Sequence, residues 1–127
     1  MNLEKVIFGF FVILACALNF GFFLGDIGRP ELHHPGELFA AVAVNLIALV
    51  LKFGDRTQLG AIHLSTSLAA CIQLLAAALY WTWAAHIGKD VSEVAAIATV
   101  VSLSGGALLA NLVSVVLLIG ETLRQAR

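Results

Sequence analysis

Charged residues are scarce in this sequence. Only 12% of its 127 residues are Asp, Glu, Lys or Arg, and 61% are hydrophobic. A soluble domain has about 25% charged and about 45–50% apolar residues, so the composition argues against an ordinary soluble fold. The basic residues are scattered along the chain, which leaves no electrostatic footprint for nucleic acid, and we expect no nucleic-acid partner. The sequence predicts a protein whose solvent is the lipid bilayer.

Cysteine and proline are also rare. Cys16 and Cys71 lie within apolar runs and lack CxxC spacing, so neither a disulfide framework nor a cysteine-based zinc site is indicated. Both prolines, Pro30 and Pro35, fall in one polar segment, where Pro35-Gly36 is a turn signal. No cofactor is expected.

Ionisable residues are missing from the interior of the long apolar runs. Proton-coupled transporters and pumps usually need such a group within the membrane, so autonomous active transport is disfavoured. His63 lies near one end of its run, where a hydrogen-bonded interfacial histidine is the favoured interpretation and a proton relay the alternative. No set of nucleophile, base and orienting group is evident, and we expect no catalytic residue and no enzymatic activity.

Four segments are long and apolar enough for membrane-spanning helices, which need about 20 residues. We expect helices at about residues 5–25, 37–53, 59–87 and 91–122, within one integral membrane domain formed by residues 1–127. The second uncharged stretch, residues 38–51, would cover only about 21 Å as a helix. The number of spans therefore needs a second criterion.

The basic residues supply that criterion. With four spans, one end of the bundle holds Lys5, Lys52, Arg56, Arg124 and Arg127, and the other holds Arg29 and Lys89. Cytoplasmic loops accumulate Lys and Arg, whereas three spans would place most of these residues outside. The sequence therefore predicts an all-α, four-transmembrane-helix bundle in a bacterial inner membrane, with both termini in the cytoplasm (N-in/C-in).

Local signals agree with these boundaries. Asp55 or Thr57 is expected to cap the third helix, and Asp90 with Glu93 resembles a capping box that opens the fourth. The chain's few Tyr and Trp residues, Tyr80, Trp81 and Trp83, lie at the predicted external end of the third helix as an aromatic belt.

A signal peptide is the alternative for the N-terminal run. Ala15-Cys16-Ala17 resembles a cleavage site, but the apolar run continues beyond it, as a retained helix would.

Small residues recur every four positions in the third and fourth predicted spans. In lipid, such rows let helices approach closely, and we expect the third span to pack against the fourth. The row of the third span starts with Ala61 and Ser65. The expected packing residues are Ala98, Ser102, Gly106, Ala110 and Ser114, with Ala69, Gln73 and Ala77, and Gly21 of the first span.

Each span also carries one carboxamide: Asn19, Asn45, Gln73 and Asn111. An amide that faces hydrocarbon leaves donors and acceptors unsatisfied, so these side chains should point inward. Hydrogen bonding between helices is the favoured role, and a polar path for an ion or solute is the alternative.

The two polar segments between spans offer further candidate sites. His33 and His34, with His86 on the same predicted side, are potential zinc or copper ligands, although they lack the helical i,i+4 spacing of a metallohydrolase. On the predicted cytoplasmic side, Lys52, Asp55 and Arg56 are expected to anchor the chain at lipid headgroups or to dock a cytoplasmic protein.

Two families of small four-span transporters lack support. Small multidrug exporters depend on a membrane-embedded glutamate in the first helix, which residues 6–25 do not contain. Asn45 and Asn111 loosely resemble the asparagines of fluoride channels. The phenylalanine-bearing segment of those channels is replaced here by His63-Leu-Ser-Thr-Ser67.

A third resemblance covers most of the chain. It rests on Asn19-Phe-Gly-Phe-Phe-Leu-Gly-Asp26, Val44-Asn45-Leu46 and Leu51-Lys-Phe-Gly-Asp-Arg-Thr57. These segments are similar to those of an uncharacterised family of small proteobacterial four-helix inner-membrane proteins. The resemblance implies bacterial origin and an integral membrane location, and it transfers no site residue.

Together these features favour a non-enzymatic membrane subunit that packs against copies of itself or against a larger channel or transporter. The alternative is a self-sufficient small oligomeric channel lined by Asn45, Gln73 and Asn111. A weaker alternative is metal binding at the periplasmic face.

Overall fold

The computed structural model describes residues 3–24, 31, 33–88 and 90–125, and the regular structure of that part is helical. Its four long helices are α1 (Leu3–Phe23), α2 (Pro35–Lys52), α3 (Gln58–His86) and α4 (Glu93–Gln125). The predicted all-α fold with four long helices is thus confirmed. The predicted end of the first helix at residue 25 lies outside the described residues, as do Asp26, Arg29, Pro30, Lys89 and Arg127.

All four helices are long and apolar enough to cross a membrane. With 18 residues, α2 extends over about 27 Å, which is close to the hydrocarbon thickness of about 30 Å. With 29 and 33 residues, α3 and α4 extend over about 44 and 50 Å. These two helices must tilt in a bilayer or project from it.

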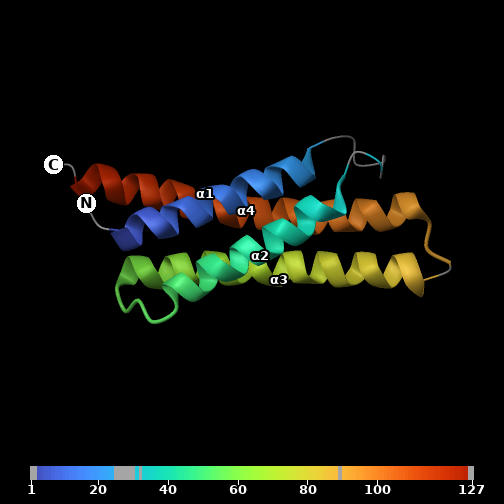
Figure 1. Ribbon diagram of the computed structural model, residues 1–127, viewed down its shortest axis with the longest axis horizontal. Coiled ribbons are helices and arrows are strands. Elements are labelled where there is room, and N and C mark those ends of the chain that lie inside the picture. Colours follow the sequence, from blue (N-terminus) through green and yellow to red (C-terminus); the bar gives the residue numbers. More distant parts are fainter. Residues whose placement is uncertain (1–2, 25–30, 32, 89, 126–127) are drawn as a thin grey trace.

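The helices form a bundle in which α1 packs against α2 and α4, and α3 packs against the same two helices. The predicted pairing of the third helix with the fourth is therefore present. Figure 1 shows both chain ends at one end of the bundle, together with the α2–α3 loop. We call this the terminal end and the opposite one the loop end. At the loop end, α3 and α4 extend past α1 and α2.

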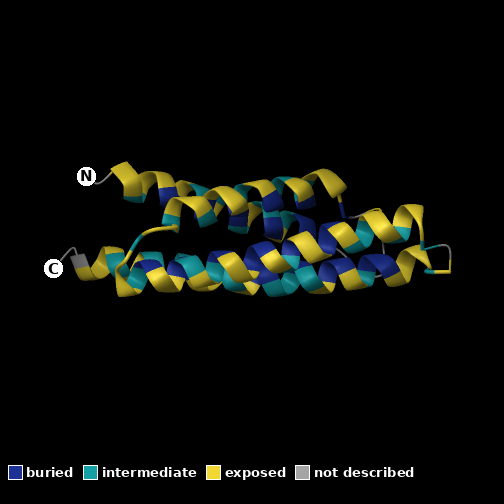
Figure 2. Cartoon of the chain, turned by 90° about the horizontal axis from the view of Figure 1, so that it is seen from below, coloured by how far each residue is buried: buried dark blue, intermediate teal, exposed yellow. Residues whose placement is uncertain are grey.

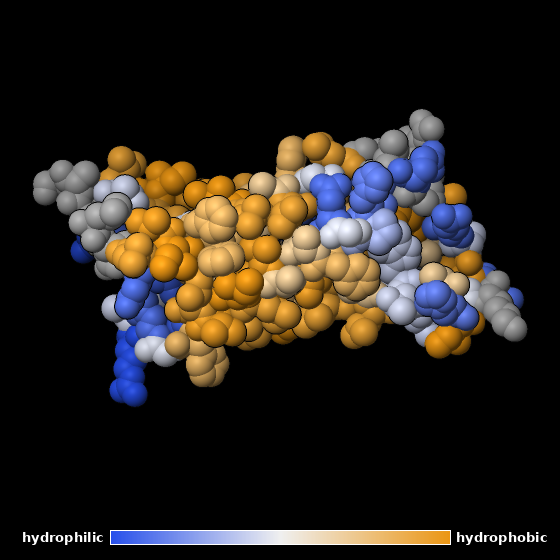
Figure 3. Space-filling view, in the orientation of Figure 1, coloured by the Kyte–Doolittle hydropathy of each residue, from blue (hydrophilic) through white to orange (hydrophobic). Residues whose placement is uncertain are grey.

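Most of the apolar surface faces outward. In the most apolar 18-residue stretch of each helix, only 28–39% of the residues are buried. Exposed residues follow the outer faces of the helices in Figure 2, and Figure 3 shows an apolar band between polar ends. A surface of this kind is compatible with a multi-pass membrane protein.

The buried apolar side chains form two separate clusters. The larger one lies toward the loop end and contains the fully buried Phe22, Leu38, Leu74 and Ile97. The smaller one lies toward the terminal end and contains Phe8, Val12 and Ala48. Buried polar side chains lie along the bundle as well: Asn19, His33, Asn45, His63, Ser67, Ser104, Asn111 and Ser114.

Side-chain caps set the starts of α3 and α4. Thr57 Oγ1 accepts a hydrogen bond from the Gly60 N–H at 2.9 Å, which confirms Thr57 as the cap of α3. Ser92 Oγ accepts from the Ala95 N–H at 3.1 Å. The predicted Asp90–Glu93 capping box was wrong, because α4 begins two residues later and Ser92 occupies the capping position.

Candidate functional site

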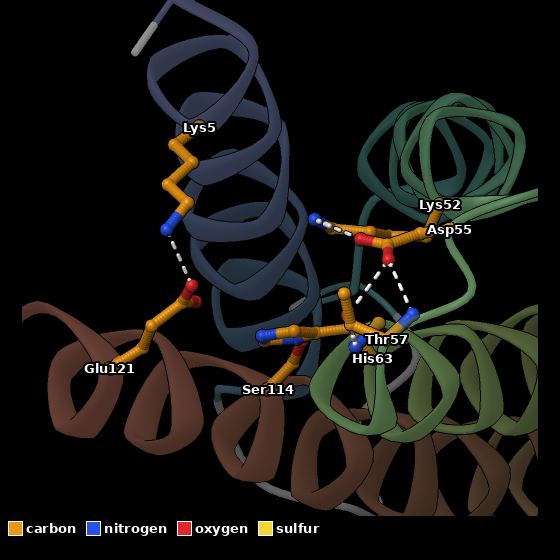
Figure 4. A network of polar contacts seen from close by, with 8 residues as sticks. Lys5, Lys52, Asp55, Thr57, His63, Ser114 and Glu121 are labelled. Atoms are coloured by element: carbon orange, nitrogen blue, oxygen red, sulfur yellow. Dashed lines mark hydrogen bonds and ion pairs between the residues drawn. The ribbon is translucent and has the colours of Figure 1, made fainter. Parts of the chain in front are cut away.

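Polar side chains from all four helices meet at the terminal end, as Figure 4 shows. Lys5 comes from α1, Lys52 from the last turn of α2, and His63 from the second turn of α3. The set, which we call the terminal polar cluster, comprises Lys5, Lys52, Asp55, Thr57, His63, Ser114 and Glu121. It combines three kinds of contact: ion pairs, a helix cap and a buried imidazole.

The first ion pair closes the bundle between its two terminal helices. Lys5 Nζ of α1 lies 2.6 Å from Glu121 Oε1 of α4. The side chains are 36% and 20% exposed, so the pair is partly shielded from water. It ties together residues 116 positions apart in the chain. Its main effect is therefore on the register of α1 against α4 rather than on local helix stability.

The second ion pair lies in the α2–α3 loop. Lys52 Nζ is 3.5 Å from Asp55 Oδ2 and 4.3 Å from the centre of the Phe8 ring on α1. An ammonium above an aromatic face gains a cation–π attraction of about 0.5–2 kcal/mol. Lys52 thus joins the end of α2 to α1 and to the start of α3.

Asp55 is held by the segment that opens α3. Its Oδ1 accepts hydrogen bonds from the Thr57 backbone N–H at 3.0 Å and from Thr57 Oγ1 at 2.7 Å. The backbone bond, followed by the hydroxyl bond and the attraction of Lys52, keeps the pKa of Asp55 below its ordinary value of 3.8. Its carboxylate packs against the Gly60 Cα, where a side-chain carbon would overlap it. Asp55 therefore stays ionised and fixed.

His63 is the most deeply buried ionisable side chain of the cluster, at 1% exposure. Its Nδ1 lies 2.7 Å from Ser114 Oγ on α4. The ring meets Phe8 edge to face, with centroids 5.0 Å apart and planes at 74°. Among the described residues, its Nε2 has no hydrogen-bond partner. One side of this imidazole is thus fixed between α1 and α4, and its other nitrogen is buried without a partner in the described part of the chain.

The Ser114 bond indicates which ring nitrogen carries the hydrogen. The neutral imidazole has two possible arrangements. In the first, Ser114 Oγ–H donates to His63 Nδ1, and only the Nε2–H group is left without a partner in the described part of the chain. In the second, Nδ1–H donates to Ser114 Oγ, and both the Ser114 hydroxyl hydrogen and the Nε2 lone pair are left without a partner there. Each unsatisfied buried group costs about 1–3 kcal/mol, so the first arrangement is favoured. His63 then presents an N–H donor at Nε2.

A cavity of about 280 Å³ adjoins this donor. Besides His63, it is lined by Lys5, Lys52, Asp55, Thr57, Leu59, Gly60 and Glu121. We call it the terminal cavity. It brings two ammonium groups, two carboxylates and one imidazole together at the end of four apolar helices.

The four carboxamides take different roles. Asn19 is fully buried, and its amide lies 2.7 Å from Ser104 Oγ of α4, so it joins two helices as predicted. Asn45 donates to the carbonyl of Ala41 in its own helix at 2.8 Å. Gln73 of α3 lies against α4, and Asn111 is 4% exposed.

The small-residue rows divide between the inside and the outside of the bundle. Gln73 meets α4 where Gly106 allows it, because a side-chain carbon at Gly106 would lie 2.8 Å from Gln73 Cδ. Ala77 and Ser114 are buried, Ala98, Ala110 and Gly21 are half-buried, and Ser102 is exposed. Ala61, Ser65 and Ala69 are exposed too. Three of the five residues of the α3 row therefore face outward.

The histidines of the loop end do not share one environment. His33 is 2% exposed, and its Nδ1–H donates to the carbonyl of Phe22 at 2.6 Å. His34 and His86 are exposed. Within the described residues, no group of three or more His, Cys, Asp or Glu side chains is close enough to hold a metal ion. His33 instead secures the end of α1 against the segment that opens α2.

Of the predicted cytoplasmic anchor, Lys52 and Asp55 belong to the terminal polar cluster, and Arg56 is exposed beside them. Sequence reasoning placed Ser114 in a packing row and did not connect it to His63. It also left Lys5 and Glu121 unpaired. Opposite charges at the same predicted end of two helices were the available signal, but the sequence does not specify which helices are neighbours.

Fold and surface define the chain as an all-helical protein whose four helices can each span a membrane. It belongs to a family of unknown function, DUF6394, whose model matches residues 32–122. That match covers α2 and α3 completely and most of α4, and it confirms the resemblance to an uncharacterised family. No curated protein and no solved structure matches the chain.

Proposed function

We propose that the protein is a non-enzymatic integral membrane subunit that crosses a bacterial inner membrane four times and associates with further copies of itself. The support for membrane insertion is the outward-facing apolar band, which water would not tolerate on this scale. The support for self-association is a narrow, exposed face on α3.

Charge asymmetry supports an orientation with both termini in the cytoplasm. By their positions in the sequence, Lys5, Lys52, Arg56, Arg124 and Arg127 belong to the terminal end, and Arg29 and Lys89 belong to the segments of the loop end. Basic residues therefore favour the terminal end by five to two. Because basic residues accumulate in cytoplasmic loops, the terminal end is the cytoplasmic one.

The observation that carries self-association is the outward-facing part of the small-residue row on α3. Ala61, Ser65 and Ala69 are exposed and four residues apart, so they form one narrow face. The Ser65 hydroxyl donates to the Ala61 carbonyl at 3.0 Å, so this face carries no unsatisfied donor into lipid. Small residues on a lipid-facing helix allow the backbone of another helix to approach closely.

A second copy is the occupant that fits this face. Copies inserted in one orientation place Ala61, Ser65 and Ala69 at the same depth. A two-fold axis along the membrane normal then brings the row against itself, as in other symmetric interfaces. Ala61, Ser65 and Ala69 are exposed, whereas Gln73 of the same row lies against Gly106 of α4. A second copy on the exposed residues would leave the contact between Gln73 and Gly106 in place.

Cysteine crosslinking in native membranes tests the proposal. Cys16 and Cys71 are replaced by alanine, and single cysteines are introduced as Ser65→Cys or, on the matched α1 control position, Ile13→Cys. Ile13 is 54% exposed. We expect disulfide-linked dimers from Ser65→Cys and few from Ile13→Cys. Equal yields at both positions would argue for random collision.

A larger side chain on the same face of α3 provides a second criterion. Ala69→Leu should lower the dimer yield of Ser65→Cys, because a larger side chain keeps two α3 helices apart. A crosslink from Ser65→Cys to a larger membrane protein in place of a second copy would indicate an accessory subunit and would reject self-association.

A further inference from the structure

The terminal cavity has a polar wall built from parts that are far apart in the chain. Its lining includes Lys5 of α1, Lys52 of α2, His63 of α3 and Glu121 of α4. It lies at the end of the helices, where the hydrocarbon gives way to headgroups. His63 is in the second turn of α3, about 8 Å from its start, within the depth that a headgroup reaches.

The unpartnered Nε2 of His63 indicates which kind of ligand group the cavity would bind. His63 is 1% exposed and lines the cavity, and its Nδ1 is occupied by Ser114. In the favoured tautomer the hydrogen is on Nε2, so this nitrogen is a hydrogen-bond donor that needs an acceptor. A buried donor without an acceptor is costly, so a ligand that accepts from Nε2–H gains this energy on binding.

The ammonium groups beside His63 supply further donors. Lys5 and Lys52 each have three N–H bonds, and each gives one to a carboxylate, Glu121 or Asp55 respectively. The two ammonium charges are matched by two carboxylates, Glu121 and Asp55, and Asp55 also accepts two hydrogen bonds from Thr57, so the remaining N–H donors rather than a net positive charge distinguish this wall. Two lysines and one imidazole N–H form a set of donors suited to an oxyanion, and phosphate is the oxyanion of the membrane surface.

An adjoining cavity gives the ligand an apolar part. Its volume is about 600 Å³, and it shares Lys52 and Asp55 with the terminal cavity. The rest of its wall is formed by Glu4, Ile7, Phe8, Val50, Leu51 and Gly54. This wall is mixed: Ile7, Phe8, Val50 and Leu51 form an apolar stretch between α1 and α2, and Glu4 lies beside it together with the shared Lys52 and Asp55. A molecule with a phosphate and an acyl chain matches this pair of cavities.

We propose that the terminal cavity binds a phosphate group, which accepts hydrogen bonds from His63 Nε2 and from the ammonium groups of Lys5 and Lys52, and that a phospholipid supplies it. The acyl part lies in the groove beside Ile7 and Val50. This site does not depend on self-association, since every residue comes from one chain. Free phosphate is the other source of the same chemistry.

Calorimetric titration of the full-length protein in dodecyl maltoside tests the site with three probes. Dioctanoyl phosphatidylglycerol carries phosphate and acyl chains, dioctanoylglycerol lacks the phosphate, and inorganic phosphate lacks the chains. The phospholipid is expected to bind and dioctanoylglycerol is not. Binding of inorganic phosphate with the same dependence on His63 would support the phosphate site and assign it to the free anion.

Three variants identify the donor. His63→Met removes it and should weaken phospholipid binding about tenfold or more, as expected for a lost hydrogen bond to a charged group. His63→Gln keeps an N–H near the Nε2 position and should retain most of the affinity. His86→Met, at the loop end, should bind like the unchanged protein.

The unchanged protein provides a measurement that requires no variant. With ¹⁵N-labelled histidine, saturating phospholipid should shift the Nε2 resonance of His63 and leave those of His34 and His86 in place. The proposal is overturned by an unshifted His63 resonance, by equal binding of dioctanoylglycerol and phospholipid, or by a folded His63→Met variant of unchanged affinity.

Discussion

Removing the Ser114 hydroxyl tests the bond on which the geometry of His63 depends. Both side chains are almost fully buried, at 2% and 1% exposure. Ser114→Ala leaves Nδ1 of the imidazole without its partner at 2.7 Å. An unsatisfied buried group costs about 1–3 kcal/mol in soluble proteins. Between membrane helices measured couplings average about 0.6 and reach about 1.7 kcal/mol. We therefore expect Ser114→Ala to lower the free energy of unfolding by about 1 kcal/mol.

A double-mutant cycle separates this bond from packing. In a His63→Met background, Ser114→Ala should change the free energy of unfolding by no more than about 0.3 kcal/mol, because no imidazole remains to be satisfied. The coupling should be about 0.6–1.7 kcal/mol. Unfolding by sodium dodecyl sulfate in mixed micelles, followed by far-ultraviolet circular dichroism, measures both values. Thr82→Ala, whose hydroxyl bonds within its own helix at 2.8 Å, is the control. A coupling near zero would refute the His63–Ser114 bond.

Two further predictions concern the starts of α3 and α4. Ser92→Ala should lower the free energy of unfolding by about 1 kcal/mol through loss of the cap, whereas Asp90→Ala should change that free energy by only a few tenths of a kcal/mol. A larger loss from Asp90→Ala than from Ser92→Ala would instead support the Asp90–Glu93 capping box. Asp55→Asn should destabilise at neutral pH, because the folded-state pKa of Asp55 lies below its ordinary value of 3.8, chiefly through the Thr57 backbone bond. A depressed pKa contributes stability that is full above that value and is lost as pH falls through the folded-state pKa, so the difference between Asp55→Asn and the unchanged protein should shrink below about pH 4 in the same unfolding assay. A difference that stays constant to pH 3 would contradict this role.

The helices could be predicted because a bilayer imposes strong demands on sequence. An uncharged run of about 20 residues has few alternatives to a helix in lipid, since the backbone must satisfy its own hydrogen bonds. The ends were less well determined. The start of α4 depends on Ser92 rather than Asp90, and two neighbouring polar residues offer nearly equal capping signals. The apolar composition of a segment predicts that it is a helix, whereas the residue at which the helix begins depends on the local geometry of its cap.

The terminal polar cluster could be predicted only in part. Periodicity places Ser114 on a face of its helix, and so it was assigned to packing. It does not reveal that His63, 51 residues away, lies opposite. Such a contact depends on which helices are adjacent and on their relative register. A helix that is apolar on every side has no distinct polar face, so its sequence periodicity indicates neither its neighbours nor its register. Lys5 and Glu121, 116 residues apart, escaped prediction for the same reason.

The long-range polar pairs show how register is fixed in this bundle. Apolar helices in lipid gain little by choosing one register over another, because the hydrocarbon is as apolar as the neighbouring side chains. Polar pairs do discriminate, since a shift leaves both partners unsatisfied. One partner in each described pair belongs to α4: Ser104 meets Asn19, Ser114 meets His63, and Glu121 meets Lys5. The first and last pairs position α1, and the middle pair positions α3. Helix α4 therefore sets the register of the helices on both sides of it, and the terminal cavity forms where two of these pairs lie close together.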